Sequence, residues 1–210
     1  MTFLCVNTSF NNCSISLVSK EKNIICNEDR NNPPSDIISI LVEDSLKSAS
    51  LKINDISGII TILGPGNYTS IRVGIAFSLG LSKSMSMPIY GISALEAISI
   101  SQKKIFEKNE MYLVSIKAVK NEFFFQVFNY LSEPLSEPIK SKLSSIEKLL
   151  SNRNLVLIGP GSTEIRELIN LKNKIIETKD YIDYQKVLLH IIENTDQYTN
   201  IVPLYLSTPF

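Results

Sequence analysis

The sequence predicts an α/β protein made of two related halves, and three observations lead to this prediction. A three-stranded β-meander opens the chain, and strands then alternate with helical patterns, which is typical of α/β folds. Two apolar strands, at residues 59–63 and 155–158, each lead straight into a Gly-Pro-Gly turn and a helical pattern. This repeated junction indicates two related halves. A chain of 210 residues has room for both, and we expect them at 1–103 and 104–210.

In the first half, the pattern starts with strands of alternating polarity and continues with helices. Ser35 is the expected cap of the first helix, and Asp36 favours its first turn. Ser93 and Glu96 form the capping-box pattern that begins the third helix. We expect strands at 3–6, 13–18, 23–26, 59–63 and 88–91, a turn at 11–12, and helices at 35–48, 69–84 and from 93 onwards.

The second half repeats the alternation. A hairpin turns around Lys120 and Asn121, and the tail after the last helix is expected to be extended and to pack back on the first half. The order β-β-β-α-β-α-β-α of the first half is that of one half of an actin-like ATPase domain (ASKHA, ribonuclease H-like). We expect strands at 112–117, 123–129 and 155–158, helices at 145–150 and 184–193, and an extended tail at 202–206.

The composition is that of an ordinary globular protein without a charge bias. With 21 basic and 21 acidic residues, any binding of nucleic acid would need a partner to supply the electrostatics. Cys5, Cys13 and Cys26 occupy strand-like positions without a CxxC pair, so we expect small core residues rather than disulfides or zinc ligands. The sequence has no signal-peptide pattern and no apolar run of about 20 residues, so we expect a cytoplasmic protein with no membrane span.

The segment Gly64–Gly74 joins a buried strand to a helix and is the most informative stretch of the chain. Such a junction presents backbone N–H groups and the positive end of a helix dipole. Gly64, Gly66, Asn67 and Thr69 are therefore candidate phosphate contacts. The motif lacks the Gly-Lys-Ser/Thr of a P-loop and is not a GxGxxG fingerprint.

Residues that would support catalysis are missing around this loop. Asn7 ends the first strand, where actin-like folds usually place an Asp that organises a metal-bound phosphate, and an amide lacks the charge that attracts magnesium. His190 is the one histidine and lies in an apolar helical run, which predicts a partly buried structural position. We therefore expect no catalytic residue and no metal site.

The helix after the loop carries two ridges of small residues in its i, i+4 rows. One row is Ser70, Gly74, Ser78 and Ser82, and another is Arg72, Ala76, Gly80 and Ser84. Small ridges let another helix approach closely. The residues alone leave two alternatives open: the helix sits between its own sheet and the helix at 35–48, or it joins that helix in a subunit interface. The second alternative assigns partner contacts to Ile38, Leu41, Ser70, Ile71, Gly74, Ile75 and Ser78.

Two blocks of the sequence resemble the signature of the bacterial tRNA threonylcarbamoyladenosine biosynthesis protein TsaB (YeaZ) family. The first is Gly-Pro-Gly-Asn-Tyr-Thr-Ser-Ile-Arg-Val-Gly at 64–74, and the second is Pro-Ile-Tyr-Gly-Ile-Ser-Ala-Leu-Glu-Ala at 88–97. The segments 6–9 and 203–206 also match, so the resemblance covers most of the chain. It departs from the family pattern at Asn7, Asn67, Ser70 and Lys117–Val119.

The resemblance implies a non-catalytic subunit that pairs with the catalytic paralogue TsaD, with the ATPase TsaE joining. That complex transfers threonylcarbamoyl to the adenosine next to the anticodon of ANN-decoding tRNAs, so tRNA is reached through the complex. The resemblance also favours the interface alternative for the helices at 35–48 and 69–84. No cofactor of its own is implied, and ATP or ADP would sit at the interface with TsaD. Free chains are expected to self-associate as homodimers. Two competing hypotheses are an ATP-dependent ASKHA-type small-molecule kinase or acyltransferase, and a homodimeric nucleotide-binding module outside tRNA modification.

Overall fold

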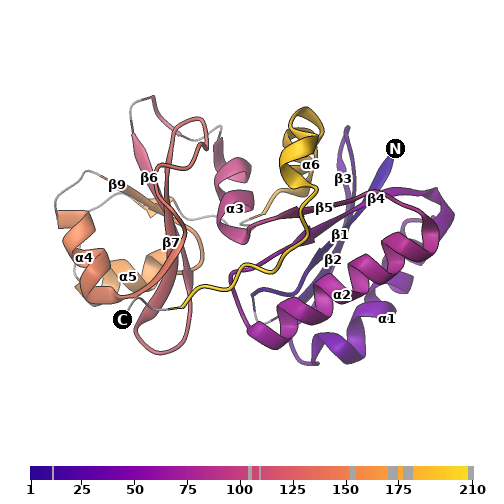
Figure 1. The fold of residues 1–210 in the computed structure, drawn as a ribbon, viewed down its shortest axis with the longest axis horizontal. Coiled ribbons are helices and arrows are strands. Elements are labelled where there is room, and N and C mark those ends of the chain that lie inside the picture. Colours follow the sequence, from indigo (N-terminus) through magenta and orange to yellow (C-terminus); the bar gives the residue numbers. More distant parts are fainter. Residues whose placement is uncertain are drawn as a thin grey trace. The chain divides into compact units, whose positions relative to one another are not determined.

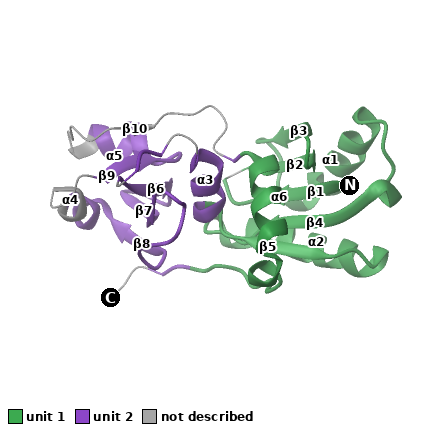
Figure 2. Ribbon diagram, turned by 90° about the horizontal axis from the view of Figure 1, so that it is seen from above, with its two compact units in different colours: residues 1–94, 183–205 green, residues 95–182, 206–210 purple. Residues whose placement is uncertain are grey.

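The computed structural model describes residues 1–10, 12–103, 106–108, 110–151, 155–169, 175–176 and 182–207, without the side chains of 148–151, 168–169 and 176. The chain divides into two compact units (Figure 2). Unit 1 comprises Met1–Ala94 and Asp183–Tyr205, and unit 2 comprises Leu95–Ile182 and Leu206–Phe210. The first unit boundary thus follows Ala94, whereas the sequence predicted it after residue 103. The segment 183–205, late in the chain, also belongs to unit 1. The expected turn at Asn11 and the expected start at residue 104 lie outside the described residues.

Unit 1 is a five-stranded mixed sheet with the strand order β3-β2-β1-β4-β5 (Figure 1). The first three strands form the expected antiparallel meander, and β4 and β5 run parallel to β1. Parallel neighbours need crossovers, which two helices supply. The elements are β1 (Thr2–Asn7), β2 (Cys13–Ser19), β3 (Asn23–Asp29), α1 (Pro34–Ser48), β4 (Ile56–Ile62), α2 (Tyr68–Met85) and β5 (Ile89–Ile92).

The helix α1 begins one residue earlier than the sequence predicted. Its N-cap position is Pro33, which makes no side-chain cap, and Pro34 occupies the first turn, where its missing N–H costs nothing. The expected capping by Ser35 is therefore wrong, because the Ser35 hydroxyl donates to the Asp36 carboxylate instead. The helix α2 has a true side-chain cap, since the Asn67 amide oxygen accepts from the Ser70 N–H at 3.0 Å.

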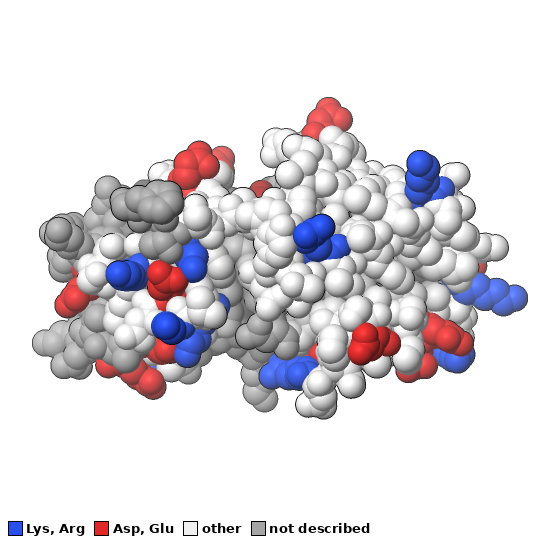
Figure 3. Space-filling model, turned by 60° about the horizontal axis from the view of Figure 1, so that its bottom comes forward, with Lys and Arg blue, Asp and Glu red and all other residues white. Residues whose placement is uncertain are grey.

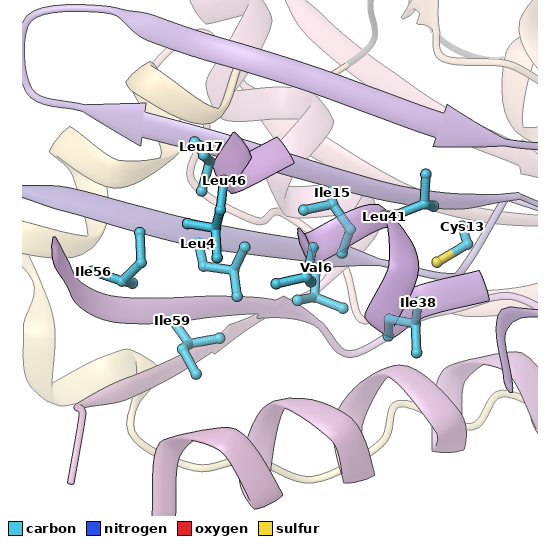
Figure 4. Close-up of a cluster of buried hydrophobic side chains, with 11 residues drawn as sticks. Leu4, Val6, Cys13, Ile15, Leu17, Ile38, Leu41, Leu46, Ile56 and Ile59 are labelled. Carbon is cyan, nitrogen blue, oxygen red and sulfur yellow. The ribbon is translucent and has the colours of Figure 1, made fainter. Parts of the chain in front are cut away.

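One core cluster fills the space between the unit 1 sheet and its two crossover helices (Figure 4). Alternate residues of β1 and β2 point to this side, as the period of a strand requires. From the helix, Ile38 and Leu41 of α1 close the cluster, while Phe77 and Leu81 of α2 pack against it. The strands contribute Leu4, Val6, Cys13, Ile15, Leu17, Ile56 and Ile59.

The opposite face of the unit 1 sheet is covered by α6 (Tyr184–Glu193), which comes from the far end of the chain (Figures 1 and 2). Hydrogen bonds tie its start to the β2–β3 turn: Gln185 Nε2 donates to the Lys20 carbonyl at 2.8 Å, and Asn23 Nδ2 donates to Asp183 at 3.0 Å. After α6 and a 3-10 turn, the tail is extended, as expected. His190 of α6 is half-buried, and its Nε2 lies within hydrogen-bond distance of the Tyr198 hydroxyl at 2.9 Å. His190 thus has a structural position.

Unit 2 repeats the plan of unit 1, because its strand order β10-β9-β6-β7-β8 matches β5-β4-β1-β2-β3 strand for strand. Its meander and parallel pairs follow the same pattern. The first glycine of each Gly-Pro-Gly turn, Gly64 and Gly159, has φ of 102°, a backbone conformation that favours glycine. The two related halves are confirmed. The elements are α3 (Ala94–Gln102), β6 (Met111–Lys117), β7 (Glu122–Asn129), β8 (Ile139–Lys142), α4 (Leu143–Ser151), β9 (Leu155–Ile158), α5 (Ser162–Ile169) and β10 (Ile175–Ile176).

Cys5 and Cys13 are buried core residues, whereas Cys26 is exposed because β3 is the edge strand of the sheet, so that part of the cysteine prediction is wrong. Among the described helices, none combines the length and the apolar character that crossing a bilayer requires.

Candidate functional site: the glycine loop and the α2 face

The glycine loop of unit 1 is pressed against the end of β1. A Cβ atom added to Gly66 would lie 2.3 Å from the Ser9 carbonyl oxygen, so the loop needs a glycine for close backbone approach. The Gly64 carbonyl accepts from the Ala94 N–H at 2.7 Å, and the Leu63 carbonyl accepts from the Leu204 N–H at 2.7 Å. The loop is thus held by contacts to β1, the start of α3 and the tail within unit 1.

Asn7 sits in a buried polar network at the end of β1. Its amide oxygen accepts from the Ser9 N–H at 2.9 Å and from the Ser9 hydroxyl at 2.8 Å. The Tyr184 hydroxyl hydrogen-bonds the side chains of Asn7 and Ser14, and burial raises the pKa of Tyr184 well above its ordinary value. This network links the meander to α6, and the sequence pattern did not reveal it because Tyr184 lies far along the chain from Asn7, Ser9 and Ser14.

The residues at the end of β1 do not fit the magnesium-bound nucleotide that an actin-like fold suggests. The oxygen of Asn7 carries no charge and already accepts two hydrogen bonds. Gly66 abuts Ser9, so the backbone fills the space between loop and strand, and the Asn67 oxygen is used as the cap of α2. Thr69 is exposed. Across the described residues, no group of three or more His, Cys, Asp or Glu side chains is arranged to hold a metal ion.

The two small-residue ridges of α2 have different surroundings. The ridge with Gly74 and Ser78 is buried against the unit's own sheet: a Cβ added to Gly74 would lie 2.4 Å from Thr8 Oγ1. That hydroxyl donates to the Ser70 carbonyl at 2.7 Å. The ridge with Gly80 is exposed, and a Cβ added there would meet nothing within 4 Å. The buried ridge therefore suits packing within the unit, and the exposed ridge is available for a subunit interface.

Most of the residues assigned to a partner contact lie inside unit 1. Ile38 and Leu41 belong to the core cluster, and Ile71 and Ile75 are 1% and 4% exposed. Gly74 and Ser78 are also buried, and Ser70 is half-buried. These seven residues therefore lie on the inner sides of α1 and α2 and not on their outer surface. Contact with a partner stays a prediction for them.

The exposed side of α2 carries little charge, with Arg72 and Lys83 as its charged residues, whereas the exposed side of α1 carries Asp36, Glu43, Asp44 and Lys47. The two helices lie side by side on the sheet (Figure 1), and Figure 3 shows a broad uncharged area on this unit with charged groups at separate points. Ile40 is 49% exposed and Leu79 is 41% exposed. Ala76 and Gly80, on the small ridge, are exposed beside Leu79. An exposed, weakly charged helix surface such as that of α2 is of the type at which another protein packs.

A two-unit α/β chain with this repeated strand order has the actin-like, ribonuclease H-like fold. The activator of 2-hydroxyisocaproyl-CoA dehydratase from Clostridium difficile, solved with bound ADPNP, matches this fold with a TM-score of 0.56 at 10% identity, over 96% of this chain and 98% of that one. YeaZ from Pseudomonas aeruginosa matches it with a TM-score of 0.76 at 16% identity, over 98% and 99% of the two chains.

Comparison of sequences identifies a family among the proteins that share this fold. The family model of TsaD, tRNA N6-adenosine threonylcarbamoyltransferase, matches residues 33–191, and the chain belongs to this family. A tRNA threonylcarbamoyladenosine biosynthesis protein TsaB of Buchnera aphidicola subsp. Baizongia pistaciae is 27% identical over 221 residues, which cover 98% of each chain. The resemblance to TsaB that the sequence motifs indicated is confirmed.

Proposed function

We propose that this protein is the TsaB-type subunit of the machinery that makes threonylcarbamoyladenosine in tRNA. The single observation that carries the proposal is the likeness to a TsaB protein over 98% of both chains. The TsaD family model supports it, because it indicates common ancestry with the transferase itself. The role assigned is to pair with TsaD and to activate it, with TsaE joining and tRNA reached through the complex.

The site chemistry supports a role without catalysis of its own. Asn7 supplies no charge for a metal-bound phosphate, and Tyr184 and Ser9 use its hydrogen-bonding groups. A kinase or acyltransferase of this fold would need an acidic group there, so the chemistry of this site does not support the competing enzyme hypothesis. We propose that the chain holds no nucleotide by itself and that ATP or ADP, where it acts, is held jointly with TsaD.

The proposed contact surface is the outer side of α1 and α2. Gly80 supports this choice, because a glycine in a helix interior costs about 1 kcal/mol relative to Ala and no described residue lies close enough to require it. Close approach of a partner helix along Ala76 and Gly80 would account for it. The same surface would serve self-association when TsaD is absent.

Reconstitution tests the function. Purified TsaD, TsaE, threonylcarbamoyl-AMP and an ANN-decoding tRNA are combined with and without this chain, and threonylcarbamoyladenosine is measured in the digested tRNA. The proposal expects modification only when the chain is present, and equal yields in both reactions would refute it. Steady ATP hydrolysis by the isolated chain would refute the non-catalytic role.

Gly80→Arg tests the surface, because the bulky charge would stand on the outer ridge without disturbing the core. Leu189→Arg is the matched control, since Leu189 is 39% exposed on α6, on the other face of the sheet. We expect Gly80→Arg to abolish co-purification with TsaD and to make the free chain monomeric in sedimentation. Leu189→Arg should leave both unchanged. If Gly80→Arg binds TsaD normally, the proposal that TsaD contacts the outer ridge of α2 is wrong.

A further inference from the structure

The C-terminal tail crosses the start of α2 and holds an aromatic side chain there. The Leu204 N–H donates to the Leu63 carbonyl at 2.7 Å, and the Leu204 carbonyl oxygen lies 3.0 Å from the position a Gly64 Cβ would take. One residue later, the Tyr205 ring packs on the Tyr68 ring with 4.6 Å between centroids. The segment 201–205 is therefore a strap fixed over the glycine loop of unit 1.

The strap and the first turn of α2 form an exposed cluster of two aromatic rings and one cation. Tyr68 is 55% exposed and Tyr205 is 46% exposed. Arg72 Nη1 donates to the Tyr68 hydroxyl at 3.3 Å, and the Arg72 guanidinium carbon lies 5.3 Å from the Tyr68 ring centre. Tyr and Arg are among the residues that most often carry the binding energy of protein interfaces. We call these three residues the aromatic–Arg cluster.

The cluster offers a charge that no carboxylate in the described part of the chain neutralises. Helix α2 contains no acidic residue, and in the described part of the chain Arg72 forms no ion pair with a carboxylate. Arg72 lies at the start of the row that continues through Ala76 to Gly80, so the cluster is continuous with the proposed outer surface of α2. A complementary partner would present a carboxylate among apolar atoms.

These features favour a protein over a nucleic acid as the occupant. Tyr205 and Arg72 both lie against the Tyr68 ring, so a nucleobase stacking there would have to compete with both of them. The chain as a whole has no excess of positive charge to hold a phosphate backbone.

We propose that the tail strap is part of the TsaD-binding surface, and that Tyr205, Tyr68 and Arg72 anchor TsaD through a carboxylate of TsaD placed opposite Arg72. This inference rests on the proposed function, because it takes TsaD as the partner. It extends the contact beyond the two helices to the last residues of unit 1.

Binding of TsaD to immobilised full-length variants tests the strap. Tyr205→Ala is expected to weaken the Kd about 10- to 30-fold, which is the scale of an interface hot spot. Tyr205→Phe keeps the ring and is expected to bind within about twofold of the original chain. Arg72→Met is expected to weaken binding and to flatten its dependence on NaCl, because the charge pair across the interface is gone. Leu189→Ala, which truncates an exposed side chain on the other face of the sheet, should bind normally.

The outcomes separate this inference from the proposed function. If the unmodified chain does not bind TsaD, the proposed function fails, and the inference fails with it. If the unmodified chain binds but Tyr205→Ala and Arg72→Met bind equally well, the inference alone is wrong. A fluorescent anticodon stem-loop RNA is titrated in parallel. Loss of RNA binding with normal TsaD binding would make RNA the occupant and overturn the proposal.

Discussion

Replacing Gly74 by alanine tests whether the inner ridge of α2 is fixed by the chain's own packing. The new Cβ would lie 2.4 Å from Thr8 Oγ1, 3.1 Å from its Cγ2 and 3.3 Å from its Cβ. Rotation of Thr8 exchanges one close contact for another, because all three atoms are near. The Thr8 hydroxyl would also lose its hydrogen bond to the Ser70 carbonyl.

The expected magnitude follows from three contributions. Overpacking costs about 1–3 kcal/mol, and loss of the Thr8–Ser70 hydrogen bond costs about 0.5–1.5 kcal/mol. Alanine returns about 1 kcal/mol of helix propensity. The net expectation is a loss of about 0.5–3.5 kcal/mol in the free energy of unfolding for Gly74→Ala.

Gly80→Ala is the matched control, since the same substitution in the same helix meets nothing within 4 Å. It should stabilise the chain by about 0.5–1 kcal/mol. Urea unfolding followed by circular dichroism measures both variants, and Thr8→Ala combined with Gly74→Ala should recover part of the loss because the closest contact is removed. If Gly74→Ala is as stable as the original chain, the packing argument is refuted.

Three further perturbations have defined outcomes. Tyr184→Phe removes the hydroxyl that hydrogen-bonds Asn7 and Ser14, and the loss of these buried hydrogen bonds should lower the free energy of unfolding in urea by about 1–3 kcal/mol. An unchanged urea midpoint would contradict the network. Asn67→Ala removes the cap of α2 and should cost about 1 kcal/mol, whereas Asn67→Asp should retain most of the stability. Burial raises the pKa of Cys13 from 9.0 to about 11, so the unfolded chain ionises first and stability should fall between pH 9 and about 11. Cys13→Ala should lose the fall in stability between pH 9 and about 11 that Cys13 causes. Identical pH profiles of stability for the two chains would argue against this contribution of Cys13.

The strands and helices of unit 1 could be predicted because their signals are local. Apolar periodicity and the Gly-Pro-Gly junction gave α2, whose observed start at Tyr68 is one residue before the expected one. The start of α1 was misplaced by one residue because Pro34 and Ser35 both suit a helix start, and only the backbone decides between them. The short edge strands β8 and β10 were missed, since two to four residues carry too little periodicity.

The polar network and the strap depend on contacts between distant parts of the chain. Nothing in the local sequence of Asn7 indicates that Tyr184 reaches it, and nothing around Tyr68 indicates Tyr205. The boundary between the units was unpredictable for the same reason. The helix that follows the last strand of each sheet, α3 or α6, is counted with the other unit, so the chain returns to unit 1 at Asp183.

The two glycines inside α2 have different surroundings, although each costs helix stability. Gly74 is explained completely by Thr8, so its presence says nothing about a partner. Gly80 has no such explanation in the described part of the chain, and the partner contact proposed above would account for its cost in helix stability. The two ridges look alike in the sequence. The structure shows that the ridge with Gly74 is buried in the unit and that the ridge with Gly80 is exposed. A partner contact on α2 should therefore follow Arg72, Ala76 and Gly80 rather than Ser70, Gly74 and Ser78.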